Sequence, residues 1–301
     1  MASFIPKGLI TALVTPFDEH GSINWSVLAT LLEYQVTSGI SGVVVTAGAG
    51  EYVNLSPEER NEVVRRSAEI LQGRIRLAAG ILAPDTHTAV TTALAARDAG
   101  AEAVLVLTPY YSHPSSAGLV SHFRRVAEEV RLPIILYNNP GRTGINLDVP
   151  VLEQLADIPD VVGVKECDRD LGRVAVKIAR LGGRLAFMSG DDDLCLPIWS
   201  IGAVGAFMAS TNLVAPWAVA CFKAAQTGDW DGARTLFFSR LLPFITLYRG
   251  PDHPGPLKQA LTLAGFPVGT ARPPLQPLSP ERLSEMARAL RELALLDQVQ
   301  V

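Results

Sequence analysis

Short runs of Val, Ile and Leu alternate along the chain with longer segments in which apolar residues recur at helical spacing. Several of the short runs are almost continuously apolar, which is typical of strands that are covered on both faces in a parallel sheet. The expected strands are Leu9–Thr15, Gly42–Thr46, Arg76–Gly80, Ala103–Leu107, Pro133–Tyr137, Val161–Lys165, Arg184–Ser189 and Ala203–Phe207.

The segments between these runs carry signals for the beginning and end of helices. Ser56 precedes Pro57, and Glu59 completes a capping box. Gly39 and Gly100 are placed to end two other helices. Besides the helix that begins after Ser56, the expected helices are Ile23–Ser38, Thr86–Ala99, Leu119–Val130, Val149–Leu155, Leu171–Leu181, Asp192–Ile201 and Leu213–Thr227.

Eight strand–helix units within residues 1–227 predict an α/β protein with a TIM (β/α)8 barrel, since eight such units close into a cylinder. Residues 228–301 show helical patterns and no strand. They predict a C-terminal extension of three helices that packs on the barrel as part of one structural unit.

Composition excludes several classes of protein. The net charge is −4 and basic residues are scattered, so no nucleic-acid partner is expected. The most apolar stretch, Ile201–Cys221, is interrupted by Gly202, Gly205 and Pro216, which favours barrel elements over a membrane span. The three cysteines are widely spaced, and residues 1–10 lack a leader pattern, so we expect free thiols and a cytoplasmic location.

Lys165 stands out because lysine is rare: only five of the 26 basic residues are lysines. It ends the apolar run of the sixth strand, at the barrel end where such enzymes build their active sites. Burial there predicts a lowered pKa and a neutral amine, the form that attacks a carbonyl. Position alone leaves open a structural ion pair with Glu166 or Asp191. The other lysines are expected to be solvated: Lys7, Lys177, Lys223 and Lys258.

Tyr137 ends the fifth strand, so it is expected at the same barrel mouth, one strand away from Lys165. A phenol there can pass a proton to a carbonyl or carbinolamine oxygen. Arg142 follows on a Gly/Pro-rich loop, and its planar guanidinium suits a carboxylate, which implies an acidic substrate. From these residues alone, a core-capping tyrosine and a surface salt bridge remain open as alternatives.

Motifs throughout the chain carry a family resemblance. They are Tyr-Asn-Asn-Pro-Gly-Arg-Thr-Gly at 137–144, Val-Val-Gly-Val-Lys-Glu at 161–166, Gly-Leu-Ile-Thr-Ala-Leu-Val-Thr-Pro-Phe at 8–17, Leu-Thr-Pro-Tyr-Tyr at 107–111, Ser-Gly-Asp-Asp at 189–192 and Pro-Gly-Pro-Leu-Lys at 254–258. In this order they resemble the dihydrodipicolinate synthase/N-acetylneuraminate lyase family over essentially the whole chain.

The resemblance implies class I aldolase chemistry with neither a metal nor an organic cofactor. Lys165 would attack C2 of a small 2-oxo acid, pyruvate, and the protonated imine would give an enamine nucleophile. Tyr137 would pass protons during imine formation. In the synthase branch the enamine adds to aspartate semialdehyde on the route to lysine, and an arginine at the position of Arg142 holds the carboxylate of that aldehyde.

The resemblance also implies a homotetramer, assembled as a dimer of dimers. In such an assembly Tyr111 reaches across the tight interface into the site of the neighbouring subunit. Local packing of Tyr110 and Tyr111 on their own loop remains the alternative.

The loop after the second strand departs from the family pattern. It reads Ala47-Gly48-Ala49-Gly50-Glu51 where the family has two hydroxyl residues, one for a proton relay and one for the pyruvate carboxylate. Backbone donors at Gly48, Ala49 and Gly50 are expected to bind the carboxylate instead. The loop does not match the glycine pattern of a dinucleotide site.

Two further departures concern specificity. Phe207 is bulkier than the small aliphatic residue usual there and is expected to narrow the substrate pocket. Pro84 and Thr88 replace amide and acidic residues at positions that resemble a lysine-feedback site, so feedback by lysine is not expected.

These departures leave two alternatives to the synthase activity. One is an aldolase or dehydratase that acts on another 2-oxo acid, such as a sugar-acid derivative. The other, from a different class, is a catalytically weak paralogue that binds an oxo acid as a sensor or scaffold.

Overall fold

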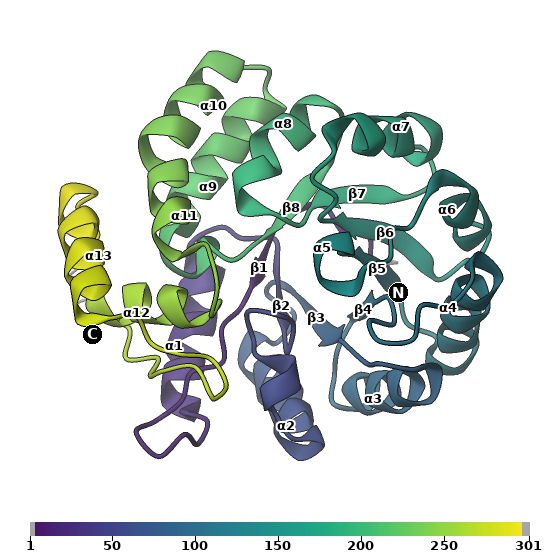
Figure 1. Cartoon of the computed structure of the whole chain (residues 1–301), viewed down its shortest axis with the longest axis horizontal. Coiled ribbons are helices and arrows are strands. Elements are labelled where there is room, and N and C mark those ends of the chain that lie inside the picture. Colours follow the sequence, from purple (N-terminus) through teal and green to yellow (C-terminus); the bar gives the residue numbers. More distant parts are fainter. Residues whose placement is uncertain (1–3, 297–301) are drawn as a thin grey trace.

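The computed structural model describes residues 4–296 and closes eight parallel strands into a barrel, with helices around its outside (Figure 1). Neighbouring strands pair in sequence order, and β1 pairs with β8 to complete the cylinder. The strands are β1 (Gly8–Ala12), β2 (Gly42–Val45), β3 (Arg76–Ile81), β4 (Ala103–Leu107), β5 (Ile134–Asn138), β6 (Val161–Glu166), β7 (Ala186–Ser189) and β8 (Gly205–Met208). The predicted TIM barrel is confirmed.

Helices follow the strands and bury their apolar faces against the sheet. In chain order they are α1 (Trp25–Thr37), α2 (Pro57–Leu71), α3 (Thr86–Asp98), α4 (Ser116–Val130), α5 (Pro140–Thr143), α6 (Val149–Leu155), α7 (Leu171–Leu181), α8 (Cys195–Ser200), α9 (Thr211–Gln226), α10 (Trp230–Leu236), α11 (Leu242–Tyr248), α12 (Gly255–Leu263) and α13 (Pro280–Glu292). Short turns of other helix types are η1 (Tyr52–Asn54), η2 (Asp192–Leu194) and η3 (Phe237–Leu241).

The capping box at Ser56 and Glu59 forms as predicted, with both reciprocal hydrogen bonds present. The first strand is shorter than predicted, because the chain leaves the ladder after Ala12 and Phe17 forms an isolated bridge with Ile23. The apolar run of residues 13–17 is buried in the core without being part of the ladder. Hydrophobicity alone therefore overestimates the length of this strand.

The C-terminal segment consists of helices and loops. Helix α10, the π-helical turn η3 and α11 form one continuous run, whereas α12 and α13 lie to one side of the barrel (Figure 1). Residues 1–3 of the predicted barrel segment and residues 297–301 of the predicted C-terminal extension lie outside the described residues.

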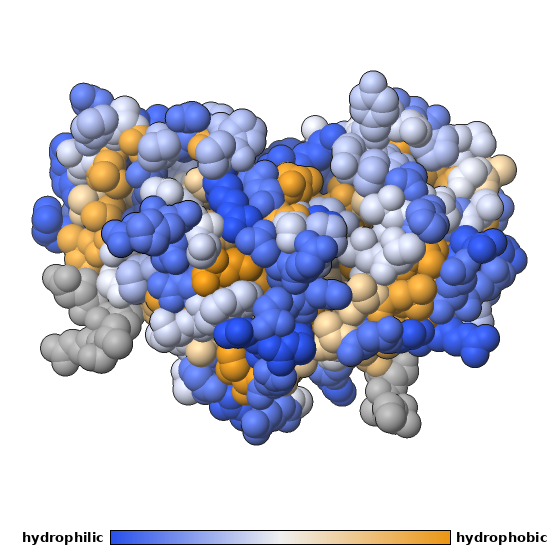
Figure 2. All heavy atoms as spheres, turned by 90° about the horizontal axis from the view of Figure 1, so that it is seen from below, coloured by the Kyte–Doolittle hydropathy of each residue, from blue (hydrophilic) through white to orange (hydrophobic). Residues whose placement is uncertain are grey.

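Apolar side chains form separate patches between charged ones on the face that Figure 2 shows. No helix within residues 4–296 is long and apolar enough to cross a membrane. The three cysteines are buried and free, as the sequence predicts.

Candidate active site

Lys165 and Tyr137 lie side by side at the carboxyl end of the barrel strands. The two residues are partners in the register between β5 and β6, so their side chains leave the sheet at the same level. The amine nitrogen of Lys165 lies 4.2 Å from the ring centre of Tyr137 and 5.6 Å from that of Phe207. Both side chains are largely buried, with Lys165 5% and Tyr137 7% exposed. The structure therefore brings the predicted amine and phenol together in a nearly dry setting.

The pKa of Lys165 results from opposing influences. Burial is the largest and lowers the pKa, but the ionisable groups of Tyr137 and Cys167, with a smaller contribution from Asp191, outweigh it and raise the pKa above the usual value. The sequence prediction of a lowered pKa is therefore wrong, because it counted burial without the neighbouring groups.

Burial also raises the pKa of Tyr137 and of Cys167. The faces of the aromatic rings beside the amine favour its charged form. The phenol of Tyr137 is the polar side chain that lies opposite Lys165 in the strand register.

Two cavities lie next to this pair and share the lining residues Arg142 and His253. The first, of about 300 Å³, is lined by Tyr137 and closed in part by residues of the C-terminal segment, Pro254, Pro274 and Leu275. The second, also of about 300 Å³, is lined by Gly190, the residue packed against Lys165.

Arg142 lies on the short helix α5 and offers a free guanidinium. Within residues 4–296 its side chain has neither an ion-pair partner nor a hydrogen bond. The surface salt bridge that the sequence left open is therefore absent from the described part of the chain. A carboxylate of a bound molecule would find an unpaired fork of donors there.

The loop after β2 has the backbone features of an anion site. Thr46 and Glu51 on either side of it adopt left-handed backbone conformations, with φ of 53° and 57°. The N–H groups of Gly48, Ala49 and Gly50 donate to no acceptor within residues 4–296. Gly48 lines the first cavity, whereas Ala49 and Gly50 are buried behind it.

The remaining predicted site residues lie at different depths. Phe207 is buried, and its ring lies beside the amine of Lys165. It lines neither cavity. Tyr111 is 85% exposed and lines neither of these two cavities. Its neighbour Tyr110 is 38% exposed and lines the first cavity.

The prediction that the other lysines are solvated is wrong for two of the four. Lys177 is buried and pairs with Glu166 at 2.9 Å, so Glu166 faces away from Lys165. Lys258 is fully buried and pairs with Glu51 at 3.0 Å. Burial lowers the pKa of Lys258 to about 8, although Glu51 acts in the opposite direction. Amphipathic helical patterns do not reveal such pairs, because each carboxylate comes from a distant segment. Lys7 and Lys223 are exposed as predicted.

Sequence reasoning missed three residues of the site. Asn139 donates a hydrogen bond from Nδ2 to the phenol oxygen of Tyr137 at 3.1 Å. His253 comes from the C-terminal segment, and burial together with Arg142 and Lys165 lowers its pKa to about 4, so its ring is neutral. Gly190 follows β7 and packs against Lys165. The motifs at 137–144 and 189–192 include Asn139 and Gly190 without assigning them a role, and no motif includes His253.

Gly190 is expected to tolerate no side chain. A Cβ atom there would lie 2.3 Å from Cys167 Sγ and 2.9 Å from Lys165 Cγ. Gly190→Ala should therefore displace the amine, and we expect kcat to fall on the order of 10²-fold and the free energy of unfolding to fall by about 1–3 kcal/mol. Gly183→Ala is the matched control, because a Cβ there meets no atom within 4 Å. Equal kcat values for the two variants would show that the packing around Lys165 is not tight.

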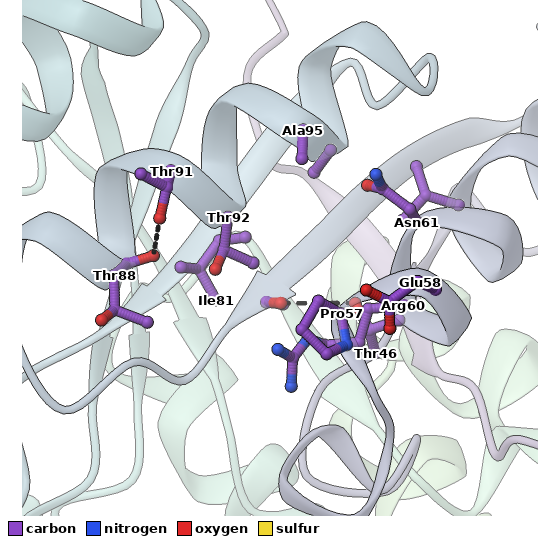
Figure 3. Close-up of a pocket in the computed structure, with 13 residues that line it drawn as sticks. Thr46, Pro57, Glu58, Arg60, Asn61, Ile81, Thr88, Thr91, Thr92 and Ala95 are labelled. Carbon is purple, nitrogen blue, oxygen red and sulfur yellow. Dashed lines mark hydrogen bonds between the residues drawn. The ribbon is translucent and has the colours of Figure 1, made fainter.

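A separate cavity of about 310 Å³ lies between α2 and α3 (Figure 3). Arg60 and Asn61 come from α2, and Thr88, Thr91 and Thr92 come from α3. Thr88, one of the two positions that resemble a feedback site, thus lines this cavity, whereas Pro84 does not. The absence of lysine feedback stays a prediction.

Within residues 4–296, no group of three or more His, Cys, Asp or Glu side chains is arranged to hold a metal ion. The polar groups at the barrel mouth are an amine, a phenol, an amide and a guanidinium. This set is suited to binding an anionic carbonyl compound and to covalent attack by the amine.

Comparisons with known proteins agree with this geometry. Residues 5–293 match the model of the dihydrodipicolinate synthetase family. A curated relative, the 4-hydroxy-tetrahydrodipicolinate synthase of Pseudomonas aeruginosa, is 37% identical over 290 residues, which cover 96% of this chain and 99% of that protein.

Solved structures give the same result. The dihydrodipicolinate synthase of Aquifex aeolicus superposes with a TM-score of 0.93 at 33% identity, covering 97% of this chain and all (100%) of that one. The enzyme of Acinetobacter baumannii, solved in complex with pyruvate, has a TM-score of 0.92 at 33% identity and covers 96% of this chain and 99% of that one. The chain therefore belongs to the dihydrodipicolinate synthetase family and is an aldolase-type lyase, as its motifs predict.

Proposed function

We propose that this protein condenses pyruvate with aspartate semialdehyde to 4-hydroxy-tetrahydrodipicolinate, through a Schiff base on Lys165. The observation that carries the proposal is the buried amine of Lys165, 4.2 Å from the ring centre of Tyr137, which itself lines a cavity of about 300 Å³. The names of the relatives support the choice of substrates.

The reaction begins when Lys165, after losing its proton, attacks C2 of pyruvate. Tyr137 passes a proton to the carbinolamine oxygen, water leaves and a protonated imine forms. Loss of a proton from the methyl group gives an enamine, whose carbon attacks the aldehyde carbon of the acceptor. The amino group of the acceptor then displaces Lys165 from C2, which closes the ring and frees the enzyme.

Two sets of donors are available for the two carboxylates. The backbone N–H groups of Gly48, Ala49 and Gly50 would bind the carboxylate of pyruvate, since they have no other acceptor in the described chain. Arg142 would bind the carboxylate of the aldehyde, because its guanidinium is free and reaches both cavities. Phe207 lines neither cavity and would restrict only the space beside the amine of Lys165.

The proposal also includes a homotetrameric assembly and a cytoplasmic location. Tyr111 would enter the site of a neighbouring subunit in a homotetramer built as a dimer of dimers. Its 85% exposure in the single chain is what an interface residue requires. The free thiols support a reducing, cytoplasmic setting.

A second candidate activity is that of an aldolase or dehydratase for a larger 2-oxo acid, such as a sugar-acid derivative. The cavity beyond Gly190 favours it, because Asp191, Asp193 and Tyr248 present acceptors and donors suited to hydroxyl groups. Arg169 already pairs with Asp191 and with Asp193, which reduces their availability and places this candidate second.

Coupled assays separate the candidates. We expect turnover of pyruvate with aspartate semialdehyde and little or none with a panel of sugar-derived 2-oxo acids. The reverse pattern would overturn the proposal in favour of the second candidate. A covalent adduct on Lys165 without turnover of any acceptor would indicate the weak, oxo-acid-binding paralogue.

A further inference from the structure

We propose that Asn139 is a positioning residue whose side-chain amide holds the phenol of Tyr137 in the orientation needed for proton transfer, and that it links this phenol to the turn that carries Arg142. The proposal deepens the proposed function and rests on it. It assigns a role in the reaction to a residue that does not itself perform the chemistry.

The first observation is the hydrogen bond from Asn139 Nδ2 to the oxygen of Tyr137, at 3.1 Å. Because the amide donates to the phenol oxygen, the phenolic proton is left free to point toward Lys165 or a bound substrate. The facing loop provides no side-chain donor of this kind, since Ala47, Gly48, Ala49 and Gly50 have no polar side-chain atoms.

The second observation is that Asn139 does not perform the usual task of its position. It is the residue before α5, where asparagine normally caps the helix with its side chain, yet no such capping bond exists there. The amide is directed to Tyr137 instead. Giving up a cap costs about 0.5–2 kcal/mol in helix stability, so the contact with the phenol is made at the expense of a local stabilising bond.

The third observation is that the backbone of Asn139 braces the turn of Arg142. Its carbonyl oxygen accepts from the N–H of Arg142 at 3.1 Å, from the N–H of Thr143 at 3.0 Å and from Thr143 Oγ1 at 3.0 Å. One residue thus fixes the proton-transfer group through its side chain and the carboxylate-binding group through its main chain.

The amide also affects the acidity of the phenol. Burial raises the pKa of Tyr137, and the hydrogen bond from Asn139 opposes that rise by stabilising the phenolate. Removing the donor should therefore make Tyr137 both less well oriented and harder to deprotonate.

The test compares Asn139→Leu with Asn139→Asp, and uses Asn61→Asp, on the exposed surface of α2, as the control for an amide-to-acid change. Aspartate keeps the size of the side chain and is an equally good helix cap, but at neutral pH it offers no donor to the phenol. We expect kcat of both Asn139 variants to fall about 10- to 100-fold, with KM for pyruvate changed by less than about threefold because the carboxylate-binding donors are untouched.

The second readout is the ultraviolet titration of tyrosine in the free protein, with Tyr137→Phe used to assign the signal of Tyr137. We expect the pKa of Tyr137 to rise in both Asn139 variants, by on the order of one unit, and to stay unchanged in Asn61→Asp. This readout needs no turnover, so it tests the contact even if the proposed substrates are wrong.

An Asn139→Asp variant with kcat within about twofold of the parent, and with an unchanged titration of Tyr137, would overturn the proposal, because a purely structural role would be preserved by this isosteric change. Failure of the proposed function has a different signature: the parent would form no adduct with pyruvate, whereas the titration of Tyr137 would still respond to Asn139.

Discussion

Replacing Lys165 by methionine is expected to reduce kcat by on the order of 10⁴-fold or more, to the background rate. Methionine fills the same narrow space between Tyr137 and Phe207 but has no amine to form the imine. The fold should persist, because the change removes a buried cation without removing volume. Steady-state assays of the purified variant measure the effect, and circular dichroism verifies the fold.

Two variants control this result. Lys165→Arg keeps the positive charge but supplies no neutral amine, so it should be as inactive as Lys165→Met. Lys223→Met changes an exposed lysine of α9 and should leave kcat unaltered. If either Lys165 variant kept kcat within about tenfold of the parent, covalent catalysis by this lysine would be excluded.

Lys258→Met should produce the largest loss of stability. It removes the ion-pair partner of Glu51 and leaves this buried carboxylate with hydrogen bonds only from the N–H of Arg272 and from Asn54 Nδ2. Breaking such a pair costs about 3–5 kcal/mol in the free energy of unfolding. Because Glu51 ends the loop that carries Gly48, the variant should also raise KM for pyruvate. Denaturant unfolding and steady-state kinetics measure the two effects.

The double variant Glu51→Gln/Lys258→Met separates the ion pair from packing. With both charges removed, the free energy of unfolding should return toward the parent value by about 1–3 kcal/mol. A loss of less than about 1 kcal/mol in Lys258→Met itself would show that the pair does not hold the C-terminal segment to the loop after β2.

The barrel was predictable because it rests on local signals. Val161–Glu166 reads as a strand from its apolar residues, and the signals at Ser56 and Gly39 mark helix ends that the structure confirms. The short helix α5 was missed, because four residues are too few to show a helical period. The helix predicted for residues 192–201 is divided in the structure into the short turn η2 and the helix α8. The division of the chain at residue 227 stays a prediction.

The site was only partly predictable. Lys165 and Tyr137 could be placed because both end strands, and the ends of parallel barrel strands meet at one mouth. The ion pair of Glu51 with Lys258 and the position of His253 could not be predicted, because both depend on where the C-terminal segment packs. The predicted direction of the pKa shift of Lys165 was wrong because the prediction considered burial but not the opposing effects of Tyr137, Cys167 and Asp191.

The most direct test is reduction with borohydride in the presence of pyruvate, followed by peptide mass spectrometry. We expect a stable adduct of pyruvate on Lys165, formed before any aldehyde is added, and no adduct in Lys165→Met. A protein that turns over pyruvate yet yields no adduct on Lys165 would contradict the account at its centre.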